Sequence, residues 1–167
     1  MNFEMMMLII FLTIAVATDL LHRKIPNVLT FPAIIFGLIY HIYLNGLDGL
    51  LFSFGGMLSG LGLFLLFYIW GMMGAGDVKL MGAVGSILGS AGVFKAFLFT
   101  AIIGGIYAVI VLAYHGQLVG FMKRIALSLK LSLLTRGPTL LPNENKESPI
   151  LCYGIAIAIG TSLSLVF

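Results

Sequence analysis

Apolar segments long enough to cross a lipid bilayer occupy most of this chain, and they constrain its fold more than any other feature. We distinguish six, which cover roughly residues 3–21, 28–44, 49–70, 77–90, 93–114 and 150–167. Of the 167 residues, 60% are hydrophobic and only 9% are charged, whereas about a quarter of a soluble domain is charged. The segments are continuous rather than alternating, which favours helices over strands. The sequence therefore predicts an all-α polytopic membrane protein with six transmembrane helices.

The basic residues predict the orientation of these helices. In a six-span arrangement, every Lys and Arg except Lys95 falls on one side of the membrane. Cytoplasmic connections carry the excess of such residues. We therefore expect the first, third and fifth connections in the cytoplasm and both termini outside, in a multi-pass protein of the cell (inner) membrane.

A polar stretch separates the fifth and sixth apolar segments. Residues 117–136 place polar side chains near one helical face and leucines on another, which is typical of an amphipathic helix lying on a membrane surface. Gly137-Pro138 ends this helix, and a polar loop follows. We expect residues 117–148 to form a cytoplasmic interfacial helix and loop within one transmembrane domain, residues 1–167.

The sequence argues against several classes of site and partner. The single cysteine, Cys152, excludes an internal disulfide and a Cys-based zinc site. No His, Cys and Asp cluster has metal-ligand spacing, and no phosphate-binding loop is present, so we expect neither a metal nor another cofactor. A net charge of only +3 argues against a nucleic acid partner. The lipid bilayer is the expected surrounding, and the sequence indicates no oligomeric state.

Two aspartates are the strongest candidates for chemistry, because ionisable residues inside apolar segments are costly and mark functional sites. Asp19 lies in the last turn of the first segment and Asp77 opens the fourth, so the predicted topology puts both near the cytoplasmic face. Of two neighbouring carboxylates, one holds a proton while the other takes a proton from water. This pattern predicts hydrolysis of a peptide bond without a metal. The alternative is two interfacial carboxylates neutralised by Arg23, Lys24 and Lys79.

The glycines before Asp77 have a use in such a site. Gly74 and Gly76 permit unusual backbone angles and close approach by another chain. A loop of this kind can pair with an extended substrate segment. Lys79 follows Asp77 closely, and its alternative role is to extend its ammonium group toward lipid head groups.

Two motifs resemble those of the type IV prepilin peptidases, a branch of the GXGD membrane aspartyl proteases. The stretch GAGDVKL, residues 74–80, is similar to the GxGDxKL signature of that family. Asp19, followed by Ile25-Pro26-Asn27, is similar to its other aspartate motif. The resemblance implies an endopeptidase that removes the short basic leader of prepilin-like precursors. In that family the cut follows a glycine on the cytoplasmic side, just before the hydrophobic helix of the substrate.

The resemblance also implies roles for individual residues. It makes Asp19 and Asp77 the catalytic pair, Gly74 and Gly76 site-shaping residues, and Lys79 a supporting residue. Many relatives carry a cysteine-bearing domain after the first span and methylate the trimmed pilin. Here that connection has about six residues and no cysteine, so the chain resembles the short, peptidase-only forms and no methyltransferase activity is expected. Relatives often have Pro-Tyr-Gly where this chain has Cys152-Tyr153-Gly154.

Three other functions stay open at this point. A preflagellin peptidase would use the same mechanism on a different precursor. A small proton-coupled transporter would use the two aspartates as proton carriers and produce no cleaved product. A non-enzymatic assembly factor of a pilus or secretion machine would tolerate the replacement of either aspartate by asparagine.

Overall fold

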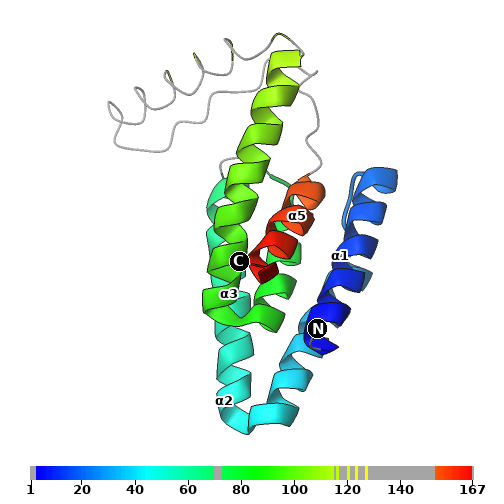
Figure 1. The fold of residues 1–167 in the computed structure, drawn as a ribbon, viewed down its shortest axis with the longest axis vertical. Coiled ribbons are helices and arrows are strands. Elements are labelled where there is room, and N and C mark those ends of the chain that lie inside the picture. The colour runs from blue at the N-terminus through cyan, green and yellow to red at the C-terminus, as the bar shows by residue number, and fades with distance from the viewer. Residues whose placement is uncertain are drawn as a thin grey trace. The chain divides into compact units, whose positions relative to one another are not determined.

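The computed structural model describes residues 3–69, 73–114, 116, 120, 123, 127 and 153–166. Four helices with defined bounds lie in this part of the chain: α1 (Phe3–His22), α2 (Asn27–Ile69), α3 (Ala75–Tyr114) and α5 (Tyr153–Val166) (Figure 1). Of these, α1, α2 and α3 are long and apolar enough to cross a membrane, and α5 is a shorter apolar helix. An all-α membrane protein is therefore confirmed. The predicted amphipathic helix and polar loop, residues 117–148, lie almost entirely outside the described residues.

The chain divides into two compact units. The first consists of Met1–Gly104 with Cys152–Phe167, and the second of Gly105–Leu151. Everything described below belongs to the first unit. Its core is formed by apolar side chains from α1, α2, α3 and α5, together with Ile25 in the turn after α1; among the most buried are Leu8, Ala15, Phe64, Leu80, Met81, Val84 and Ile157.

Both long helices are interrupted once, at a glycine. The backbone leaves helical geometry at Gly46 (φ 60°, ψ −131°) in α2 and at Gly89 (φ 71°, ψ 178°) in α3. Glycine adopts such positive φ angles at little cost. Unbroken, helices of 43 and 40 residues would extend about 60 Å, twice the thickness of a hydrocarbon core of about 30 Å. The two breaks lie at or beside the predicted gaps between the second and third and between the fourth and fifth apolar segments.

Small residues let the second half of α2 pack closely on the first half of α3. A Cβ atom added at Gly56 would overlap the carbonyl oxygen of Gly85, and one at Gly60 would overlap that of Met81. These glycines belong to the motifs Gly56-x-x-x-Gly60 and Gly85-x-x-x-Gly89, which predict close approach of helix backbones. The motifs therefore serve packing within the chain.

The break at Gly89 leaves helix carbonyl groups that need hydrogen-bond donors, because the last turn of a helix has no internal donors for them. The Ser53 hydroxyl donates to the Ser86 carbonyl at 2.6 Å. His41 Nε2 donates to the Ile87 carbonyl at 2.9 Å. His41 is only 7% exposed, so its ring lies inside the protein. Side chains from both halves of α2 thus donate hydrogen bonds to the free carbonyl groups where α3 is interrupted.

Helix α5 lies between α1 and α3 (Figure 1). Two glycines set its contact with α3. A Cβ atom at Gly160 would be 2.5 Å from the backbone nitrogen of Thr100, and one at Gly104 would be 3.4 Å from the Tyr153 ring. The contact with α3 brings the N-terminal end of α5 to the C-terminal end of α1, where Asp19 lies.

Candidate active site

Asp19 lies at the C-terminal end of α1 and is 7% exposed. Its Oδ2 accepts a hydrogen bond from the backbone N–H of Gly154, at 3.1 Å. Its own carbonyl accepts from the N–H of Arg23 at 2.8 Å. Arg23 ends the helix in the left-handed conformation, with φ 51°, a position that glycine fills most often. The carboxylate is therefore held by a helix far away in the sequence.

Asp77 is held by its own helix. It is the third residue of α3, after Ala75 and Gly76, and is 8% exposed. Its Oδ2 accepts from the N–H of Gly74 at 3.1 Å, and its N–H donates to the Gly74 carbonyl at 3.1 Å. A side chain at the third helical position that reaches back to the capping residue is half of a capping box. The GAGD stretch therefore aims this carboxylate by local geometry.

The two carboxylates meet in one cavity. Its volume is ≈ 330 Å³, and its lining residues are Asp19, Arg23, Lys24, Ile25, Asn27, Gly74, Ala75, Gly76, Asp77 and Lys79. The two aspartates interact electrostatically there. All five predicted site residues thus lie around the same space, although Asp19 and Asp77 are 58 positions apart in the sequence. The convergence is a finding of the structure, whereas the role of each residue stays a prediction.

Gly76 allows the turn after α1 to approach the start of α3. A Cβ atom at Gly76 would lie 3.2 Å from Cβ of Ile25 and 3.4 Å from its backbone nitrogen. Ile25 is buried and follows the two basic residues that line the cavity. At Gly74 the nearest atom to an added Cβ would be Oδ2 of Asp77, at 3.5 Å. Only Gly76 is therefore closely packed against the turn.

Lys79 is tied to the start of α2. Its Nζ donates to Oδ1 of Asn27 at 2.8 Å and lies 5.8 Å from the centroid of the Phe31 ring, within the range of a cation–π interaction. The sequence does not predict this contact or assign Asn27 to the site. The resemblance motif that contains it is the one signal that points to this asparagine.

Gly154 is the second residue that sequence reasoning misses. It donates to Asp19 from α5, although 135 positions separate the two. A glycine at the start of an apolar helix is a weak signal, because many such glycines serve only packing. The resemblance of Cys152-Tyr153-Gly154 to the Pro-Tyr-Gly of relatives is the one feature of the sequence that points to it.

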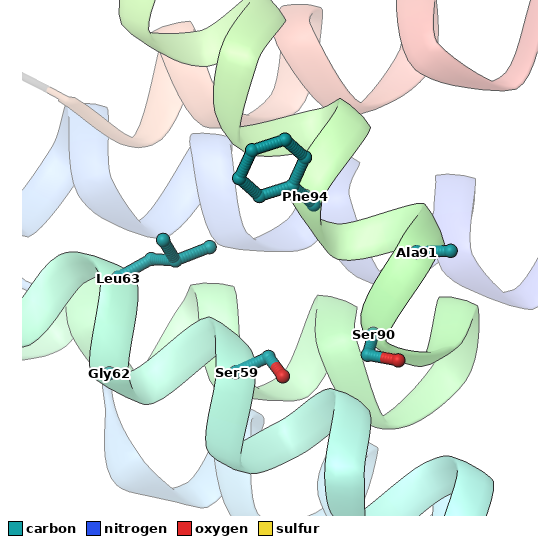
Figure 2. Close-up of a pocket in the computed structure, with 6 residues that line it drawn as sticks. All are labelled: Ser59, Gly62, Leu63, Ser90, Ala91 and Phe94. Carbon is teal, nitrogen blue, oxygen red and sulfur yellow. The ribbon is translucent and has the colours of Figure 1, made fainter.

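A second hollow is larger but carries no ionisable side chain. Its volume is ≈ 620 Å³, and it is lined by Ser59, Gly62, Leu63, Ser90, Ala91 and Phe94. Figure 2 shows it between the second half of α2 and the α3 turn that follows Gly89. Its lining is mostly apolar, so it offers no acid or base for catalysis. The smaller cavity with the two aspartates is the candidate active site.

Comparison with known proteins identifies the family of the chain. The family model of the type IV leader peptidase family matches residues 6–109, more than half of the chain. The matched residues include both aspartates and the GAGD stretch, whereas Gly154 and the rest of α5 lie outside them. No curated protein and no solved structure matches the chain. On the family match, the chain belongs to the type IV leader peptidase family.

Proposed function

We propose that this chain is a membrane-embedded aspartyl endopeptidase in which Asp19 and Asp77 together activate a water molecule. Family membership implies a peptidase. The observation that carries the more specific mechanism is the convergence of two buried aspartates on one cavity, each held through Oδ2 by a backbone N–H. Such anchoring keeps both carboxylates in place at the cavity.

In the proposed reaction, one carboxylate accepts a proton from the water as its oxygen attacks the peptide carbonyl. The partner carboxyl donates its proton to the carbonyl oxygen. The tetrahedral intermediate then collapses and the C–N bond breaks. The leaving amine takes the proton that the first carboxylate accepted from water, and a hydroxyl of the intermediate returns a proton to the partner carboxylate. General acid–base assistance of this kind contributes about 10²–10⁴-fold to the rate.

The proposed substrate is a prepilin-like precursor with a short basic leader, cut after a glycine on the cytoplasmic side of its hydrophobic helix. The motifs of residues 74–80 and 19–27 support this substrate class. An archaeal-type preflagellin would be cut by the same chemistry. The breaks at Gly46 and Gly89 support six membrane-crossing segments, and the placement of Lys and Arg supports a cytoplasmic site. On this reading the protein resides in the cell (inner) membrane.

A cleavage assay in membranes tests the proposal. A precursor with a basic leader, a glycine and a hydrophobic helix is co-expressed with the wild type, Asp19→Asn or Asp77→Asn. Asp48→Asn is the matched control, because Asp48 is exposed and does not line the cavity. We expect the wild type and the control to cleave, and each active-site variant to lose about 10²–10⁴-fold in rate.

Cleavage that survives either active-site substitution would refute the two-aspartate mechanism. A transporter would instead show substrate flux that depends on both aspartates, with no cleaved product. An assembly factor would support its machine equally well with either substitution.

A further inference from the structure

We propose that Gly154, at the N-terminal end of α5, is a positioning residue of the active site: its backbone N–H and its lack of a side chain hold the carboxylate of Asp19 at the cavity. The inference rests on the proposed function and deepens it. The match to the family model ends at residue 109, before α5 begins. The match therefore gives α5 no role in catalysis.

The contact between Gly154 and Asp19 has both a polar and a steric component. Gly154 N–H donates to Oδ2 at 3.1 Å. A Cβ atom at Gly154 would lie 2.6 Å from Oδ2 and 3.2 Å from both Cβ and Cγ of Asp19. Because α5 begins at Tyr153, this N–H is among those that have no acceptor inside the helix. Any larger residue at this position would displace the carboxylate.

Asp19 needs this support more than Asp77 does. The N–H that holds Asp77 is three residues away, in the same helix start. Asp19 sits at the C-terminal end of α1, where the helix dipole disfavours a negative charge, whereas the N-terminal end of α5 favours one. The charged groups that share the cavity with Asp19 are Asp77, Arg23, Lys24 and Lys79. The α5 terminus therefore supplies a fixed donor for Asp19 from a third helix.

The packing of α5 on α3 fixes the position of that donor. Gly160 lets α5 lie against the Thr100 backbone, and Gly104 lies under the Tyr153 ring. Tyr153 immediately precedes Gly154, so the contact with Gly104 holds the segment that carries the N–H. A small displacement of α5 therefore moves Asp19 relative to Asp77.

Two glycine-to-alanine variants test the inference. Gly154→Ala places a methyl group against the Asp19 carboxylate. Gly55→Ala in α2 is the matched control, because a Cβ atom there would have no neighbour within 4 Å and Gly55 does not line the cavity. Misplacement of a catalytic group by about 1 Å costs about 10²-fold in rate. We expect kcat for precursor cleavage to fall about 10²-fold in Gly154→Ala with little change in KM, and Gly55→Ala to match the wild type.

A second readout does not require cleavage. The purified full-length protein is treated with a carbodiimide and an amine, and the labelling of Asp19 and Asp77 is followed by peptide mass spectrometry. We expect Gly154→Ala to change the labelling rate of Asp19 several-fold, while Asp77 of that variant and both aspartates of Gly55→Ala label as in the wild type.

The outcomes separate the inference from the proposed function. If the wild type cleaves, and Gly154→Ala retains wild-type kcat and Asp19 labelling, the inference is wrong and the peptidase proposal stands. A fall in kcat that equals the loss of folded protein, with unchanged labelling, would assign Gly154 a purely structural role and also overturn the inference. If no precursor is cleaved, the function fails, and Asp19 labelling alone decides whether Gly154 positions the carboxylate.

Discussion

The two glycines of the GAGD stretch should differ in their tolerance of a methyl group. Gly76→Ala would put Cβ 3.2 Å from Cβ of Ile25, which is closer than ordinary contact, whereas Gly74→Ala would find its nearest neighbour 3.5 Å away. Ile25 is buried at the end of the turn that carries the basic lining residues. The substitution at Gly76 therefore forces that turn and the start of α3 apart.

Two contributions set the change in stability, and a displacement beside Asp77 sets the change in rate. Overpacking of a well-filled site costs about 1–3 kcal/mol, and alanine regains about 1 kcal/mol over glycine inside a helix. The free energy of unfolding of Gly76→Ala should therefore fall by only about 0–2 kcal/mol. A displacement of a few tenths of an ångström beside Asp77 should lower kcat about 3–10-fold, since about 1 Å costs about 10²-fold. Gly74→Ala weakens only the helix cap and should stay within about threefold of the wild type.

The assay is initial-rate cleavage of the precursor by equal amounts of detergent-purified, folded protein. Unfolding in mixed micelles is measured in parallel, so that activity is compared per folded molecule. If Gly74→Ala loses as much activity as Gly76→Ala, or more, contact with Ile25 is not the reason that the motif requires its second glycine.

Two further substitutions test the helix ends. His41→Phe keeps a ring in the buried site but leaves the Ile87 carbonyl without its donor, and should lower the free energy of unfolding by about 1–3 kcal/mol. Unfolding in mixed micelles measures this, with the exposed His22→Phe as control, and a cost equal to that of the control would contradict the capping role. Arg23→Gly should raise the free energy of unfolding by about 1 kcal/mol, because a side chain in the left-handed conformation is strained. Arg23→Ala should bring no such gain, and an equal gain would show that charge rather than backbone conformation sets the effect.

Much of the candidate site is predictable from the sequence because its determinants are local. Asp77 and Gly74 are three residues apart, and the capping geometry that joins them depends only on the start of one helix. Asp19 is recognisable as an ionisable residue within an apolar segment. The breaks near Gly46 and Gly89 follow from apolar stretches too long for a single bilayer crossing.

The residues that the sequence does not reveal are those whose partners are distant. His41 has the pattern of an interfacial histidine, yet its partner is a carbonyl 46 positions away. Asn27 has the pattern of a helix start, yet it holds Lys79 across 52 positions. Neither partner can be identified until the two halves of α2 and the start of α3 are packed together.

The sequence by itself thus determined the all-helical membrane class and the family and marked two aspartates as candidates, because apolar length, intramembrane charge and short motifs are properties of contiguous residues. Only the tertiary structure decided that Asp19 meets Asp77 in one cavity and that Gly154 holds it. The physical reason is that glycine contacts set the approach of α5 to α3 and α1. A hydrogen bond across 135 positions exists only when that packing has formed.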